Sequence, residues 1–135
     1  MQETHKNYVQ FIPQFLILIS KNLPRQTAIK GLLGMSIPNT PILVTDNFSS
    51  VIQHLFANHC SKVLVVIDGW SLDNDEINMN DLVSKLDAAI QELPNKRSVY
   101  LVENSKNFRS HQTSRVLAGD ITGNQFMDTL RDLCK

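Results

Sequence analysis

Short apolar runs alternate with amphipathic segments along most of this chain. Residues 15–19 are continuously apolar over the length of a strand, which is typical of a parallel strand covered on both faces. Residues 62–68 form a similar run that is closed by an acidic residue. Together with three shorter runs, these segments predict five buried strands. The shorter runs are residues 42–44, 99–102 and 116–118.

Between the first three strands, apolar residues recur at helical spacing. Pro24 suits the first turn of one helix, where its missing N–H has no intrahelical partner, and Gly34 marks the expected end of that helix. Asp46 or Asn47 can cap the next helix. The apolar face of this second helix is expected to consist of Val51, Ile52, Leu55 and Phe56.

The later helices give signals of unequal strength. In residues 79–93 the apolar positions fall at alternating spacings of three and four, and Pro94 ends the pattern. Residues 104–114 have weak periodicity, so a short or irregular helix is expected there. Thr122 and Gln125 form a capping box that opens a last helix. Its expected inward residues are Phe126, Met127, Leu130 and Leu133.

A strand followed by a helix, repeated along the chain, predicts an α/β fold with right-handed crossovers. The expected architecture is a flavodoxin-like (CheY-like) doubly wound five-stranded parallel sheet, (βα)5. A length of 135 residues and a mass of 15.3 kDa fit one domain with a full core. We expect residues 1–13 to be a flexible N-terminal arm and residues 14–135 to be the domain.

Charge and cysteine usage narrow the function classes. The 13 basic and 13 acidic side chains cancel, so the chain lacks the basic footprint of a nucleic-acid-binding protein. Contact with DNA is expected only through a domain absent from this chain. Cys60 and Cys134 have no zinc-ligand spacing, and such free thiols fit a reducing cytoplasm. The apolar stretch 11–19 is interrupted by Pro13 and is too short to cross a membrane, so no membrane association is expected.

The candidate functional residue is Asp68, which ends the third strand and precedes a polar loop at residues 69–78. In open α/β sheets, ligands and reacting groups gather at the carboxyl ends of the strands. An aspartate at this position, in a chain of five strand–helix units, resembles the receiver domain of bacterial response regulators. Residues 18–33, which begin Leu-Ile-Ser-Lys-Asn-Leu-Pro and end in Leu-Leu, resemble the first strand and helix of the LuxR/FixJ (NarL-like) branch of that family.

The resemblance implies a pseudo-receiver, with a degenerate phosphorylation site. Receivers hold magnesium with two acidic residues after the first strand, where this chain has Ser20 and Lys21. They use a lysine after the fifth strand and a threonine or serine after the fourth, where this chain has Gly119 and Glu103 (or the following Asn104). A lysine repels Mg²⁺, and phosphoryl transfer depends on charge neutralisation. We therefore expect no catalytic residue, no metal, no cofactor and no enzymatic activity.

Several interpretations of this strand edge stay open. Three interpretations of Asp68 are open. It is a phosphoacceptor that is no longer used or is paired with another residue, a cap of the turn at Gly69, or a working phosphoacceptor. Lys21 either takes the place of the metal and pairs with Asp68, or is solvated. Trp70 either covers the degenerate pocket, partly buried against the domain, or contacts a partner.

Other motifs do not point to chemistry. The acidic cluster at residues 73–76 lacks the glycine and the distal glutamate of an EF-hand loop, and we expect it to be solvated. His54, His59 and His111 show no ligand or triad spacing. A glycine-rich phosphate loop is also missing from the sequence.

The function that the resemblance implies is that of a cytoplasmic regulatory domain in a LuxR-family transcription regulator of the two-component type. Such a domain acts by homodimerisation or by pairing with another regulator, through the fourth helix, fifth strand and fifth helix, or through the first and fifth helices. One alternative is a stand-alone adaptor or antagonist that binds another regulator. Another is a small-molecule or nucleotide-binding domain that uses Ser20, Asn22 and the Gly69–Trp70 loop. The candidate interface residues are Arg109, His111, Arg115, Met127, Asp128, Arg131 and Asp132.

Overall fold

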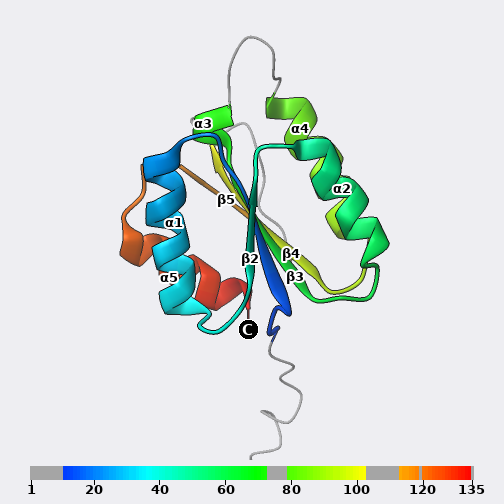
Figure 1. The fold of residues 1–135 in the computed structure, drawn as a ribbon, viewed down its shortest axis with the longest axis horizontal. Coiled ribbons are helices and arrows are strands. Elements are labelled where there is room, and N and C mark those ends of the chain that lie inside the picture. The colour runs from blue at the N-terminus through cyan, green and yellow to red at the C-terminus, as the bar shows by residue number, and fades with distance from the viewer. Residues whose placement is uncertain (1–10, 73–78, 103–112, 119, 135) are drawn as a thin grey trace, which may run out of the picture.

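The computed structural model describes residues 11–72, 79–102, 113–118 and 120–134. These residues form a five-stranded parallel sheet in the order β2-β1-β3-β4-β5 (Figure 1). This order confirms the predicted flavodoxin-like α/β fold. The strands are β1 Phe15–Ile19, β2 Ile42–Thr45, β3 Val63–Asp68, β4 Lys96–Val102 and β5 Ser114–Ala118.

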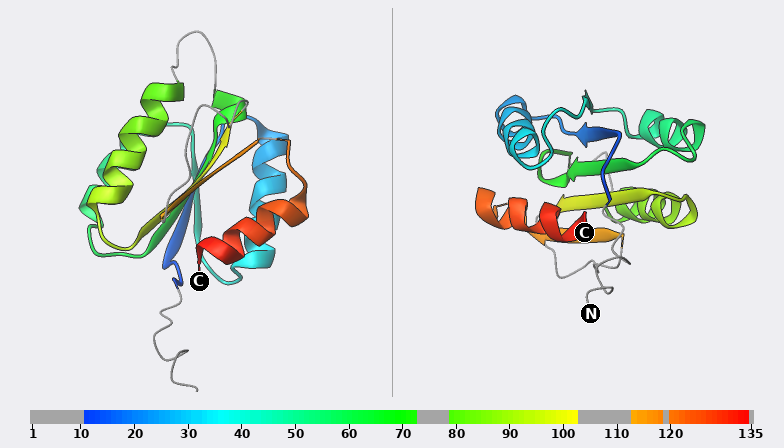
Figure 2. Two further views of the ribbon diagram at one scale, coloured as in Figure 1. Left: turned by 180° about the vertical axis from the view of Figure 1, so that it is seen from behind. Right: turned by 90° about the horizontal axis from the view of Figure 1, so that it is seen from below.

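Helices cover both faces of the sheet. α1 and α5 pack on one face, and α2 and α4 pack on the other (Figure 1; Figure 2). The short helix α3 follows β3 directly at the carboxyl edge, which is the edge where the parallel strands end, and the opposite edge is the amino edge. The helices are α1 Leu23–Ser36, α2 Phe48–Ala57, α3 Gly69–Leu72, α4 Met79–Glu92 and α5 Gly123–Leu133.

The core lies on both faces of the central strands β1 and β3. Successive side chains of a strand point to opposite faces of the sheet. Ile17 and Val65 therefore join the cluster under α2 and α4, whereas Leu16 and Leu64 join the cluster under α1 and α5. Because both faces are covered, both sets of side chains have to be apolar, and the sequence shows a continuous apolar run.

Within the described ranges, side chains cap the N-termini of α1, α2 and α5. Asn47 caps α2, and Thr122 with Gln125 forms the capping box of α5, as predicted. Asn22, which was not predicted to be a cap, starts α1 by accepting a hydrogen bond from the N–H of Arg25 at 3.0 Å. This cap sets where the first turn of α1 stands relative to the carboxyl edge.

Two predictions about the helices are wrong in detail. α1 continues past Gly34 to Ser36. A glycine that ends a helix usually has a positive φ, and no described glycine has one, so Gly34 is an ordinary exposed helical residue. The end of α1 is explained by Pro38, which disfavours helical backbone at the residue before it. Phe56, expected on the inward face of α2, is 45% exposed, because it lies about 100° around the helix from the buried Leu55.

β4 and the N-terminal segment also differ from the expectation. β4 begins earlier than predicted, at the buried residue Lys96. Of the expected arm at residues 1–13, Phe11 and Pro13 are buried. The main-chain N–H of Phe11 donates to the carbonyl oxygen of Cys134 at 2.9 Å. The end of that segment is therefore packed against the domain.

A polar cluster interrupts the apolar layer beneath α4. Tyr100 Oη donates to Asp87 Oδ1 at 3.3 Å, and Ser114 Oγ donates to the same oxygen at 2.8 Å. Ser98 Oγ lies 2.7 Å from Ser114 Oγ. Burial raises the pKa of Tyr100 far above its usual value, so the phenol stays neutral. These hydrogen bonds tie α4 to both β4 and β5.

Some expectations fall partly or wholly outside the described residues. The loop predicted at residues 69–78 begins with α3, and its remainder is not described. The irregular helix expected within residues 104–114 lies outside up to residue 112, and Ser114 begins β5 instead. The acidic cluster at 73–76 and the residues Glu103 and Gly119 also lie outside. In the part of the chain that is described, no helix combines the length and apolar character needed to cross a membrane.

Candidate functional site

The candidate site lies where β1 and β3 end side by side. Ile19 of β1 is in register with Ile67 of β3, so Ser20 and Asp68 emerge next to each other at the carboxyl edge. This is the switch point of a sheet with this strand order, because the chain leaves the two strands in opposite directions. The side chain of Asp68 is fully buried.

The carboxylate of Asp68 is bound by two side chains. Arg25 Nε donates to both carboxylate oxygens at 2.9 Å, and Arg25 Nη2 lies 2.8 Å from Oδ1. Ser20 Oγ donates to Oδ2 at 2.9 Å. Forked contacts between a guanidinium and a carboxylate are among the stronger hydrogen-bonded ion pairs. The charge of Asp68 is therefore balanced within the chain.

The cation beside Asp68 is Arg25 and not Lys21, whose side chain is exposed. Of the two interpretations of Lys21, the structure agrees with the solvated side chain and not with the pairing to Asp68. Lys21 lies in the bend that follows β1, and its side chain is exposed whereas that of Ser20 is buried. Arg25 can reach the carboxylate because Asn22 starts α1 and places it in the first turn. That helix-start signal could have found Arg25 from the sequence.

Hydrogen bonds hold the turn after β1 against α3. Ser71 Oγ donates to the main-chain oxygen of Asp68 at 3.0 Å and accepts from the N–H of Lys21 at 3.0 Å. It also lies 3.2 Å from Ser20 Oγ. Gln26 Nε2 donates to the main-chain oxygen of Ser20 at 2.9 Å. The donors around Asp68 are thus held in place by a connected network.

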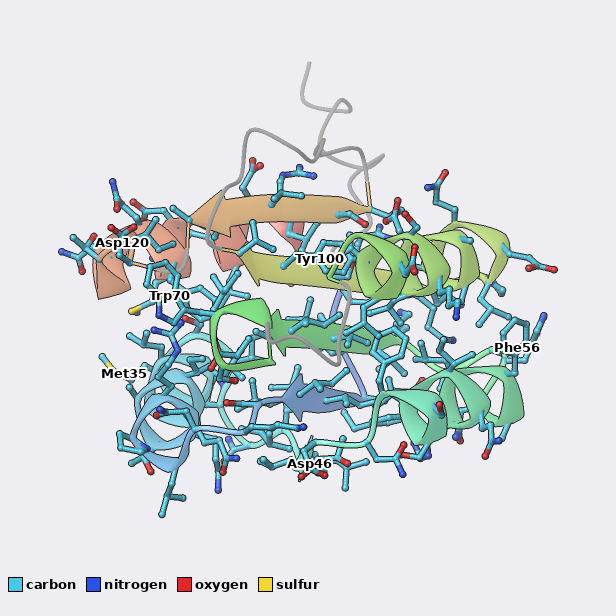
Figure 3. All side chains as sticks on the ribbon, turned by 90° about the horizontal axis from the view of Figure 1, so that it is seen from above. Met35, Asp46, Phe56, Trp70, Tyr100 and Asp120 are labelled. Carbon is cyan, nitrogen blue, oxygen red and sulfur yellow. The ribbon has the colours of Figure 1, made fainter. Side chains whose placement is uncertain are left out.

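Trp70 directly follows the end of β3 and contacts Arg25. The guanidinium carbon of Arg25 lies 5.6 Å from the centroid of the Trp70 ring, within the range of a cation–π interaction. Trp70 is 42% exposed, and Figure 3 shows it at the carboxyl edge, on the side of α1 and α5. The ring therefore packs partly on the domain and leaves part of its surface open to solvent.

This arrangement does not suit a magnesium ion. Mg²⁺ needs oxygen ligands in octahedral geometry and is usually held by one or two carboxylates. Both oxygens of Asp68 face donors of the chain, and the exposed Lys21 adds a positive charge at the same edge. Among the described residues, no group of three His, Cys, Asp or Glu side chains is placed to hold a metal.

Two hollows lie along the seam between α1 and α5. One, of about 240 Å³, lies beside Arg25 and has a mainly apolar lining that includes Phe126. The other, of about 510 Å³, lies at the amino edge between residues 11–13, the end of α1 and α5. Met127, one of the interface candidates, lines this second hollow. Met35, which also lines it, is 70% exposed.

The charged interface candidates within the described residues form pairs inside the chain. Arg115 Nη2 lies 3.2 Å from Asp132 Oδ2, and Arg131 Nη1 lies 2.9 Å from Asp128 Oδ1. Exposed pairs of this kind contribute little to stability, so they can exchange partners at an interface. Two further candidates, outside the described residues, are Arg109 and His111.

Comparisons with known proteins give no family assignment. The family models, the curated proteins and the solved structures that were searched contain no match to this chain. The fold and the site establish a class: a flavodoxin-like α/β domain whose Asp68, at the carboxyl end of β3, is closed off by Arg25. The function has to be inferred from that site.

Proposed function

We propose that this chain is a receiver-like regulatory domain of a bacterial transcription regulator, which is not phosphorylated and acts by pairing with a second copy or with another regulator. The observation that carries the proposal is the closed state of Asp68, which is fully buried and bound by Arg25 and Ser20. A phosphoacceptor has to present a carboxylate oxygen to the phosphorus atom. Here both oxygens are bound by donors of the same chain.

The charge balance at the carboxyl edge supports the same proposal. In phosphoryl transfer, metal ions and cationic side chains neutralise the negative charge of the transferred group. Arg25 already neutralises Asp68, and the exposed Lys21 disfavours the approach of a further cation. A domain built in this way stays in one state and associates without a phosphorylation signal.

The α1–α5 side offers a surface for association. Single exposed apolar side chains are ordinary on protein surfaces. On this side, however, Met35 and Ile12, 70% and 60% exposed, lie together at the hollow of about 510 Å³. A two-fold axis beside the hollow would bring the same patch of both copies into contact.

A titration with beryllofluoride and magnesium tests whether Asp68 accepts a phosphoryl group. We expect the amide NMR spectrum of the wild type to stay unchanged around Asp68, as it should in the control variant Asp68→Asn. A magnesium-dependent change in the wild type that disappears in Asp68→Asn would show a working site and overturn the proposal.

Sedimentation equilibrium over a range of protein concentrations tests association. We expect a dimer whose dissociation constant is the same with and without beryllofluoride. Met35→Asp should weaken it by about tenfold or more, since a charge would be buried at the contact. The control Phe56→Asp changes an exposed apolar residue on the other face and should have no effect. A monomer at every concentration would refute homodimerisation and leave only pairing with another regulator.

A further inference from the structure

A second buried charge lies at the amino edge, at the opposite end of the strands from Asp68. Lys96 begins β4 and is only 1% exposed. Four converging main-chain oxygens, the carbonyl cage, lie within hydrogen-bonding distance of its Nζ. The oxygens belong to Asn58 (3.0 Å), His59 (2.9 Å), Ser61 (2.6 Å) and Pro94 (3.2 Å).

The carbonyl cage joins two turns that are distant in the sequence. Asn58, His59 and Ser61 lie between α2 and β3, whereas Pro94 lies just before β4. Asn58 is also the C-cap of α2, where main-chain carbonyls lack helical partners and carry partial negative charge. The ammonium therefore binds where the backbone already favours a cation.

The partners of Lys96 are unusual for a buried charge because none of them is acidic. Among the described residues, no carboxylate forms an ion pair with Lys96. An ammonium has three N–H donors, yet four oxygens converge on it at 2.6–3.2 Å. The cage thus offers more acceptors than the ammonium has protons. Converging carbonyl oxygens are also the means by which proteins hold dehydrated K⁺.

We propose that the carbonyl cage is a monovalent-cation site whose resident is the Lys96 ammonium, and that NH₄⁺ or K⁺ occupies it when the side chain is shortened. This inference does not depend on the proposed function, because the cage and Asp68 lie at opposite edges of the sheet. Burial lowers the pKa of Lys96, whereas hydrogen bonds to four carbonyl oxygens favour its charged form.

The competing explanation is that Lys96 matters only through the packing of its apolar stem. Lys96→Met retains most of that stem and removes the charge. Lys96→Ala removes both and leaves a space that is open to a small cation. The two variants therefore distinguish a cation site from apolar packing.

Urea denaturation in the chlorides of choline, sodium, potassium and ammonium, at one ionic strength, tests the proposal. The wild type should have one midpoint in all four salts because its cage is filled. In choline chloride, Lys96→Ala should have its unfolding midpoint at a lower urea concentration than the wild type. Added ammonium or potassium should raise this midpoint most of the way back to the wild-type value, and the effect should saturate with the salt concentration. Lys96→Met should gain nothing, because its side chain blocks the space.

Two results of this experiment would overturn the proposal. One is a midpoint of Lys96→Ala that is the same in choline, potassium and ammonium chloride. The other is an equal response to ammonium in Lys96→Met, which would show a general salt effect.

A measurement on the wild type decides the matter if Lys96→Ala folds in none of the salts. Nitrogen-15 NMR detects the Nζ protons of a lysine only when their exchange with water is slow. The Lys96 signal, assigned by its loss in Lys96→Met, should persist at neutral pH, where exposed lysines such as Lys21 and Lys30 give none. An Nζ group of Lys96 that exchanges as fast as theirs would contradict the cage.

Discussion

The two edges of this sheet each bury a charge and neutralise it in different ways. At the carboxyl edge, the side chain of Arg25 pairs with Asp68. At the amino edge, main-chain carbonyls alone bind Lys96 among the residues that the structure describes. An ion pair depends on the identity of both residues, whereas carbonyl oxygens are supplied by any sequence that forms the same turns. A change at either of two positions therefore breaks the first arrangement, but only loss of Lys96 or of the turns breaks the second.

This difference bears on function. The Arg25–Asp68 pair lies at the switch point, where open α/β sheets bind their ligands. The strength of the pair therefore decides whether the carboxylate of Asp68 can become free to bind another group. The Lys96 cage has no exchangeable side-chain partner and holds two turns together. The carboxyl edge is therefore the candidate functional site, whereas the charge at the amino edge holds two turns of the fold together.

Removing the guanidinium is the strongest way to test this comparison. Arg25→Ala leaves the buried Asp68 without its cation and should lower the free energy of unfolding by about 3 kcal/mol. This value is at the lower end of the range for buried ion pairs, because Arg25 is partly exposed. Urea denaturation measures the loss. In the control Lys21→Ala an exposed side chain is removed from the same edge, and the change should stay within about 0.5 kcal/mol.

A double-mutant cycle separates the pair from its surroundings. Asp68→Asn should be less harmful in the Arg25→Ala background than in the wild type, with a coupling energy above about 1 kcal/mol. Additive effects of the two substitutions, or equal losses in Arg25→Ala and Lys21→Ala, would show that the pair does not hold the carboxyl edge.

Alkaline pH provides a test of intermediate size at the amino edge, where α5 ends at Cys134. Burial raises the pKa of the Cys134 thiol from 9.0 to about 11. The unfolded chain therefore loses this proton first, so the contribution of the thiol is complete below pH 9.0 and is lost as the pH rises towards 11. The free energy of unfolding should fall by at most about 2 kcal/mol through this group.

Matched cysteine variants isolate that contribution. Cys134→Ala should flatten the alkaline slope of the unfolding free energy, whereas Cys60→Ala, which removes an exposed thiol, should leave it as in the wild type. Tyr100 is present in both variants, so its own titration cancels in the comparison. Burial lowers the pKa of Lys96 and the charge of Cys60 raises it, so the wild type is measured beside both variants. The same slope in both variants would mean that Cys134 does not contribute.

Helix capping gives the smallest test. Asn22→Ala removes the cap of α1, which carries Arg25, and Asn47→Ala removes the cap of α2, which carries neither buried charge. Loss of a cap costs about 1 kcal/mol. Asn22→Ala should cost up to about 1 kcal/mol more than Asn47→Ala in urea, because it also loosens the turn that aims Arg25. Equal losses would show that Arg25 keeps its place without the cap.

The two edges also differ in how far they could be predicted. Asp68 was found because it ends a continuous apolar run. Whether Lys21 pairs with Asp68 or is solvated could not be decided from its place after a strand end, and Arg25 was missed. The start of β4 was missed because Lys96 and Arg97 break the apolar pattern that marks a buried strand.

Local patterns were enough to predict the α/β class and the place of Asp68, because periodicity, caps and strand ends depend on neighbouring residues. The strand order was expected from the general rules for such folds, and the structure has that order. The partners of the two buried charges were decided by the tertiary structure. Arg25 and Asp68 are 43 positions apart, and Lys96 reaches carbonyls up to 38 positions away. Such contacts exist only once the sheet has brought its edges together, and a carbonyl oxygen leaves no mark in the sequence.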